Sequence, residues 1–179
     1  MDIVLLVKIT ARAWALPVLA LMHDGAPGRQ AVLLDRTGAG RTALGQSLTH
    51  LIALGLVERT PGHGHPLRPE YRLTDAGETA GAMASAVMRA SPGQSGVPLL
   101  RRAWSLPVLA VSQRPRLFSE IKQALPGITD RALSQSLKGL QGQSWLDRHV
   151  EADVHPPRAR YRAAGDGVRI GQAAMGLAA

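Results

Sequence analysis

The chain repeats itself, and this repetition limits the folds available to it. AWALPVLA begins at Ala13 and AWSLPVLA at Ala103, so seven of eight letters match at a spacing of 90 residues. RTALGQSLTHL, from Arg41, corresponds to DRALSQSLKGL, from Asp130. A further pair, HPLRPEYRLTDAG and HPPRARYRAAGDG, is again 90 residues apart. Matching segments in the same order at nearly constant spacing indicate the tandem duplication of one structural unit.

Two copies are too few for a solenoid, which needs at least about three repeats to bury a continuous core. The 179 residues instead accommodate two small domains of about 80 residues each. The Ser, Pro and Gly residues of RASPGQSGVP are typical of a linker. The sequence therefore predicts one domain over residues 1–90, a linker over 91–98 and a second domain over 99–179.

The second copy begins with an apolar run, Leu99–Val111, that has helical spacing. Pro107 interrupts it, and proline is tolerated in a helix only within the first turn. Two alternatives follow: the helix begins near Ser105, with Ser105 as its N-cap, or it bends at Pro107. The same choice arises at Pro17 in the first copy. We expect the tryptophans of both runs, Trp14 and Trp104, to pack in the core.

Two further helices and a hairpin follow in the second copy. Residues 116–127 predict a short amphipathic helix that ends at Pro-Gly, and in the first copy Val32 takes the place of Ile121. Residues 128–143 predict another helix, with Thr129 as N-cap and an apolar stripe of leucines, Leu133, Leu137 and Leu140. Residues 145–150 and 160–163 predict two strands joined by a long polar loop.

This order of elements predicts a winged helix-turn-helix, in which two short helices meet at a tight turn and a β-hairpin follows. The predicted fold class is therefore mainly α with small β-hairpin wings (α+β). We expect two tandem winged helix-turn-helix domains in one chain, arranged as a pseudo-dimer.

The charge favours a polyanionic partner, nucleic acid first and acidic membrane surfaces second, and we expect double-stranded DNA. The net charge is +8, with nine Lys/Arg and seven Asp/Glu in residues 1–90 and twelve and six in residues 91–179. Polar and basic residues on the outer face of the second helix of each turn are suited to a major groove, and arginines of the wing to the backbone. The candidate DNA-binding residues are Arg41, Thr42, Gln46, Thr49, Arg68, Thr129, Arg131, Ser134, Gln135, Lys138, Arg158 and Arg160.

Residues 101–170 resemble the HxlR-type (DUF24) winged-helix regulators of bacteria, through RLFSEIKQALPGIT, RALSQSLKGL and VHPPRARYR. Residues 11–88 resemble them more loosely, through RTALGQSLTHLIALGLVERT and PEYRLTDAG. The resemblance implies a DNA-binding transcription regulator. Members of the family generally carry one such domain and act as homodimers, so a chain with two copies leaves open whether two chains form a homodimer. The chain has no cysteine, which excludes the thiol-based oxidant sensing of some members.

Other functions have little support in the sequence. The nucleotide, metalloprotease and nucleophile motifs of enzymes are missing, so we expect neither an enzyme nor a cofactor. His63 and His65 supply only two imidazoles, too few for a metal site. The apolar run after KITAR imitates a signal peptide, but it recurs at Ala103, where no signal peptide stands. No apolar run approaches the ~20 residues of a membrane span. We therefore expect a cytoplasmic protein that does not enter a membrane.

Two alternatives to a DNA-binding regulator stay open. The near-neutral first copy suits a tandem winged-helix scaffold that binds proteins in a chromosome or transcription complex. A ligand-responsive regulator would hold a small molecule between the two units, although no residue pattern in the sequence specifies that ligand.

Overall fold

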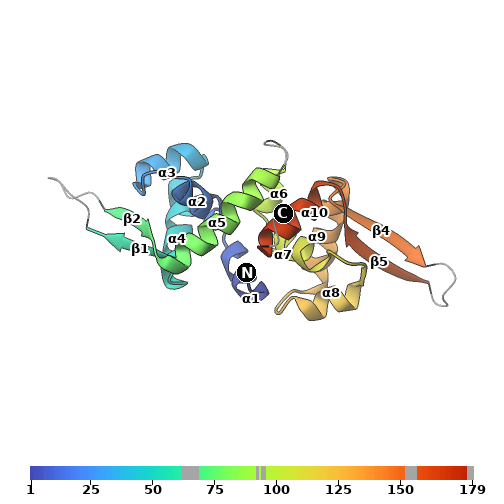
Figure 1. Ribbon diagram of the computed structural model, residues 1–179. Coiled ribbons are helices and arrows are strands. Elements are labelled where there is room, and N and C mark those ends of the chain that lie inside the picture. Colours follow the sequence, from blue (N-terminus) through green and yellow to red (C-terminus); the bar gives the residue numbers. More distant parts are fainter. Residues whose placement is uncertain (62–68, 92, 94–95, 152–156, 177–179) are drawn as a thin grey trace.

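The protein consists of two similar units that lie side by side and form an elongated molecule (Figure 1). This computed structural model describes residues 1–61, 69–91, 93, 96–151 and 157–176. In Figure 1 the two β-hairpins extend from opposite ends, while helices fill the centre. The predicted fold class, two tandem winged-helix units that are mainly α with small β wings, is confirmed.

The first unit contains five helices and two strands among its described residues. In chain order they are α1 (Ile3–Thr10), α2 (Ala15–His23), α3 (Gln30–Thr37), α4 (Arg41–Ala53), β1 (Val57–Thr60), β2 (Glu70–Leu73) and α5 (Asp75–Ala90). The second unit repeats this order with one strand more. Its elements are α6 (Val97–Leu100), α7 (Ser105–Val111), β3 (Arg116–Leu117), α8 (Phe118–Ala124), α9 (Asp130–Gly142), β4 (Leu146–Glu151), β5 (Arg158–Ala163) and α10 (Asp166–Ala174).

The repeated octapeptide begins a buried helix in each unit. α2 starts at Ala15 and α7 at Ser105, so each proline falls in a first turn, where its missing N–H removes no helical hydrogen bond. Trp14 and Trp104 occupy the N-cap positions, so the prediction of Ser105 as N-cap was wrong. Both tryptophans are half-buried rather than fully in the core. The predicted apolar run is divided between two helices, because α6 ends before α7 begins. α6 also starts inside the segment predicted as a linker.

The helix-turn-helix of the second unit is α8 followed by α9. Thr129 is the N-cap of α9, as predicted, and its hydroxyl accepts a hydrogen bond from the N–H of Ala132 at 3.2 Å. The leucine stripe of α9 is buried. In the first unit α3 and α4 take these places. Leu33, not Val32, is the buried residue of α3, so the predicted correspondence of Val32 with Ile121 was wrong by one position.

A third strand in the second unit was not predicted. β3 pairs antiparallel with β5, which places β5 between β3 and β4. In the first unit the matching contact is a single bridge between Arg29 and Glu70, beside a 2.8 Å hydrogen bond from the N–H of Tyr71 to the carbonyl of Gly28. A two-residue strand is too short to show alternation in a sequence, so hydrogen bonding to β5 defines it.

The two units join through helices of both, and of these α7 lies in the predicted apolar run. α5 packs against α10, and α1 of the first unit packs against α7 of the second. α5 crosses the front of the molecule to meet α10 in Figure 1. In the described part of the chain no single helix is long and apolar enough to span a membrane. The helices α1 and α2 together reach that length and apolar character, but the chain bends by 104° between them.

Candidate nucleic-acid interface

The outer face of α9 carries the predicted base-reading residues. Leu133, Ser136, Leu137 and Leu140 are buried, so the opposite side of the helix faces solvent. All four side chains predicted there are exposed: Arg131, Ser134, Gln135 and Lys138. Thr129 is exposed as well, but its hydroxyl oxygen is already engaged in capping the helix. The structure thus gives Thr129 a structural function at the start of α9.

The outer face of α4 has the same arrangement with weaker charge. Its buried side contains Leu44, Ser47, Leu48 and Leu51, and the predicted residues Arg41, Thr42, Gln46 and Thr49 are all exposed. This face presents one cation, Arg41, whereas the α9 face presents two, Arg131 and Lys138. Both helices offer amide and hydroxyl groups that are able to hydrogen-bond base edges.

The wing of the second unit gathers its arginines on one face. Because successive side chains of a strand point to opposite faces, Arg158, Arg160 and Arg162 of β5 share a face. Arg158 is exposed, whereas Arg160 is half-buried and its Nε donates to Oε1 of Glu151 at 2.6 Å. Arg162 lies opposite Asp147 in the register. Arg162 is exposed as well, so Arg158 and Arg162, neither of which forms an ion pair with a described residue, are better placed for DNA phosphates than Arg160.

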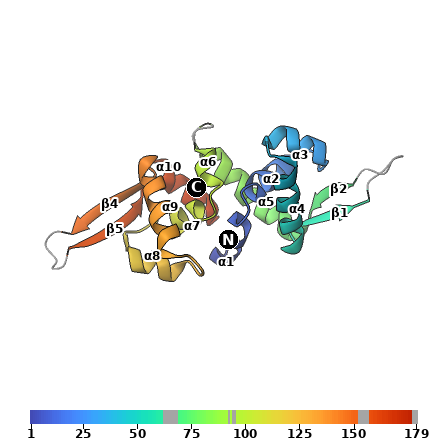
Figure 2. The ribbon, with the colours of Figure 1, turned by 180° about the vertical axis from the view of Figure 1, so that it is seen from behind.

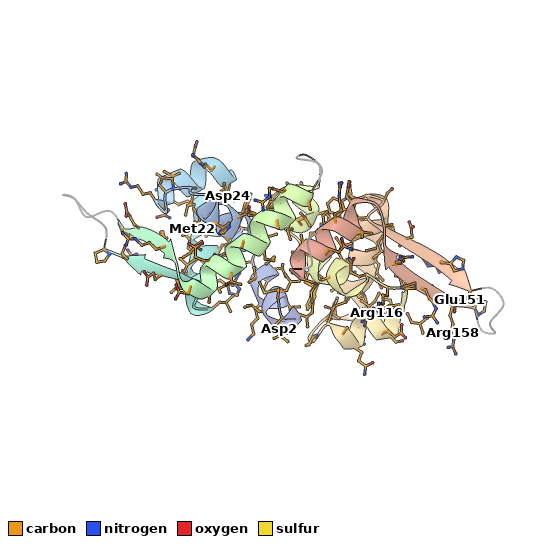
Figure 3. All side chains as sticks on the ribbon, in the orientation of Figure 1. Asp2, Met22, Asp24, Arg116, Glu151 and Arg158 are labelled. Carbon is orange, nitrogen blue, oxygen red and sulfur yellow. The ribbon has the colours of Figure 1, made fainter. Side chains whose placement is uncertain are left out.

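Figure 3 labels three residues of the sheet in the second unit. Glu151 and Arg158 lie toward its far end, and Arg116 of β3 lies nearer the body of the unit. Arg116 lies opposite Tyr161 in the register, so its side chain points to the other face of the sheet from Arg158. Arg116 was absent from the predicted site because β3 was not predicted.

The wing of the first unit carries the opposite balance of charge. Glu70 stands where the second copy has Arg160, and it accepts a hydrogen bond from Nε of Arg29 at 3.0 Å. Glu58 lies opposite Arg72 in the register. Among described residues the face that carries Glu70 holds two carboxylates, Glu58 and Glu70, and one arginine, Arg72. The matching face of the second wing holds two carboxylates and three arginines. Arg68, predicted to bind DNA, lies outside the described residues.

One basic residue beside α9 was not among the predicted DNA-binding residues. Arg102 is exposed and lines a surface hollow together with Gln135 and Lys138. The sequence held a signal for it, since Arg12 precedes Trp14 at the spacing at which Arg102 precedes Trp104. A basic residue two positions before each tryptophan is thus common to the two copies.

α4 and α9 face the same side of the molecule. In the view of Figure 2 both lie toward the viewer, and α5 lies behind α2 and α4. Figure 1 shows the reverse side, which α5 and α10 cover. Two candidate recognition helices on one side, with a wing at each outer end, match the layout expected of a dimeric helix-turn-helix protein on DNA.

The described residues contain no group of three or more His, Cys, Asp or Glu side chains close enough to hold a metal ion. His63 and His65, the pair considered above for a metal, lie outside the described residues.

Comparison with known families agrees with this architecture. The model of the HxlR-like helix-turn-helix family matches residues 9–91 and again residues 99–178. The chain belongs to the HxlR-like helix-turn-helix family. The two matches lie in tandem and agree with the interpretation of a DNA-binding transcriptional regulator built from two copies of one unit.

A solved structure gives a more distant similarity. It is a crystal structure from Porphyromonas gingivalis W83, assigned to the MarR family of transcriptional regulators. It shares 25% sequence identity over 45% of this chain and 82% of its own chain, with a TM-score of 0.39. No curated protein sequence matches the chain at a significant level.

Proposed function

We propose that this protein regulates transcription by binding double-stranded DNA with two recognition helices, α4 and α9, and the two wings that follow them. The two DNA-binding units correspond to residues 1–90 and 99–179. The observation that carries the proposal is the exposed row of Arg131, Gln135 and Lys138 on a helix whose opposite side is buried. Side chains of these types donate to base edges and phosphates in a major groove.

The second unit binds more strongly in this proposal. Its recognition helix presents two cations where α4 presents one, and its wing face has an excess of arginine where the described part of the first wing face has an excess of carboxylate. Since phosphate neutralisation supplies much of the affinity of a protein for DNA, the two half-sites differ in strength. A single chain therefore recognises an operator with two unequal halves.

The test begins with selection of bound fragments from genomic DNA and a footprint on the best of them. A footprint spanning two half-sites about one or two helical turns apart is expected if both helices bind. Absence of binding at about 50–100 mM salt, where phosphate contacts still hold, would contradict the proposal. Capture of a stoichiometric protein partner by a chain without DNA affinity would favour the scaffold function instead.

Matched substitutions separate the two helices. Arg131→Ala and Gln135→Ala in α9 should each weaken specific binding by about 1–3 kcal/mol. Arg41→Ala and Gln46→Ala change the corresponding region of α4 and should weaken specific DNA binding less. Equal losses in the two helices would contradict the inequality of the half-sites, and no loss in either would contradict base reading by these helices.

A further inference from the structure

A cavity of about 380 Å³ lies where the first unit meets the beginning of the second. α2, the end of α3, α5 and α6 form its walls. Much of the wall is apolar, from residues such as Pro17, Leu21, Met88 and Val97. A volume of this size with a few converging polar groups is typical of a site for a small organic molecule.

The charges around the cavity are unbalanced. Asp24, the C-cap of α2 labelled in Figure 3, is a carboxylate of the wall. Its Oδ1 accepts a hydrogen bond from Oγ of Ser85 at 2.6 Å and lies 3.7 Å from Nη1 of Arg89, so its charge already has a partner. Arg36 and Arg101 also line the cavity and form no ion pair with any described residue. The cavity therefore has an excess of positive charge.

Arg101 is the more constrained of these two arginines. Its Cζ lies 4.3 Å from the centroid of the Trp14 ring, a cation–π contact that orients the guanidinium. Its Nε is buried and has no hydrogen-bond partner among the described residues. Buried donors without a partner are rare because each costs the desolvation of an N–H group. An acceptor that belongs to a ligand would satisfy this one.

We propose that the cavity binds a small organic carboxylate. The carboxylate pairs with the guanidinium of Arg101, and the apolar part of the ligand packs on Leu21, Met88 and Val97. A planar guanidinium held against Trp14 is suited to this role because its donors match the two oxygens of a carboxylate. Arg36, which is exposed at the cavity wall, adds to the attraction of an anion.

The duplication provides one such site per chain, not two. Arg101 lies 90 positions after Ala11, just as Trp104 lies 90 positions after Trp14. The corresponding place beside Trp104 therefore has a methyl group in place of the guanidinium. A ligand that needs Arg101 should bind the chain with a stoichiometry of one.

The position of the cavity connects a ligand to both units. Thr37, at its wall, is the last residue of α3, and the turn that follows leads into α4. Val97 and Arg101, on the other side, belong to the start of the second unit. A ligand held between them alters the placement of α4 relative to the second unit and so the affinity for DNA. This coupling, unlike the binding itself, rests on the proposed function.

Isothermal titration of the whole chain without DNA tests the binding. The probes are 1-naphthoate and benzoate, each compared with its neutral amide at the same pH and salt concentration. We expect the carboxylate to bind one to one and the amide to bind about tenfold more weakly, since a charge-assisted hydrogen bond is lost. Equal binding of acid and amide, two sites per chain, or no binding of either acid at millimolar concentration would overturn the proposal.

Substitutions locate the site. Arg101→Gln should weaken the carboxylate about tenfold, whereas Arg102→Gln, a neighbour that does not line this cavity, should leave it unchanged. Leu21→Trp fills the cavity without removing a charge and should abolish binding, which keeps the test decisive if Arg101→Gln does not fold. Circular dichroism confirms the fold of each variant. Full binding by both Arg101→Gln and Leu21→Trp would overturn the proposal.

A separate measurement of DNA affinity, with and without the carboxylate, tests the coupling. A change in affinity that Arg101→Gln removes is expected. An unchanged affinity would overturn the coupling while the titration still establishes the site. A protein that binds the carboxylate and no DNA would refute the proposed function and leave the site intact.

Discussion

Oε1 of Glu151 lies 2.6 Å from Nε of Arg160, although the residue directly opposite Glu151 in the register is Arg158. The ion pair is thus diagonal across the wing. It pairs Arg160 with a carboxylate and leaves Arg158 exposed, without an ion pair to any described residue. Two arginines two positions apart on one strand therefore differ in exposure and in charge pairing.

The first prediction separates these two arginines by the salt dependence of DNA binding. Arg158→Ala should flatten the dependence of log K on log salt by about 0.9, the contribution of one phosphate contact. Arg160→Ala should flatten it less, because Glu151 already offsets that charge. Binding isotherms at several salt concentrations provide the measurement. Equal slopes for the two variants would refute the distinction.

The second prediction concerns the charge of the first wing. Glu70 pairs with Arg29 at 3.0 Å and adds a negative charge to the face expected to approach DNA. Glu70→Gln should release Arg29 and strengthen DNA binding, with a steeper salt dependence by up to about 0.9. The matched control is Glu78→Gln, an exposed carboxylate on α5 that pairs with His23. The idea fails if Glu78→Gln strengthens binding as much as Glu70→Gln.

The third prediction assigns Thr129 to helix capping. Thr129→Ala removes the hydrogen bond to the N–H of Ala132 and should lower the free energy of unfolding by about 1 kcal/mol. Thr129→Ser keeps the hydroxyl and should retain most of that stability. Chemical denaturation of both variants is the measurement. A loss of DNA affinity in Thr129→Ser at unchanged stability would instead favour a direct contact with DNA.

The fourth prediction compares two glycines in helices of the first unit. A Cβ at Gly77 of α5 would overlap the carbonyl oxygen of Leu56, so Gly77→Ala should destabilise the protein by about 1–3 kcal/mol. A Cβ at Gly45 of α4 would meet no atom within 4 Å, so Gly45→Ala should stabilise it by about 0.4–1 kcal/mol. Thermal unfolding measures both. The two substitutions should change the stability in opposite directions. A loss of stability in both variants, or a gain in both, would contradict the packing.

Several elements were predictable because their cause is local. The stripe of Leu133, Leu137 and Leu140 has helical spacing, and the polar side of that helix follows from it. A Thr before an acidic first turn predicted the start of α9. Because of the duplication, an element predicted in one copy also predicts the matching element of the other copy. The match is displaced where the spacing between the two copies changes by one or two residues. That change explains the error at Val32, whose neighbour Leu33 fills the core.

The sequence by itself determined two winged helix-turn-helix units, because periodicity, capping residues and repetition act along the chain. Only the tertiary structure decided which charges remain available, since pairing depends on distances across strands. Arg160 with Glu151 and Arg29 with Glu70 show this in the two wings. The strand β3 and the cavity beside Trp14 and Arg101 have the same origin: contacts between residues far apart in the chain define both.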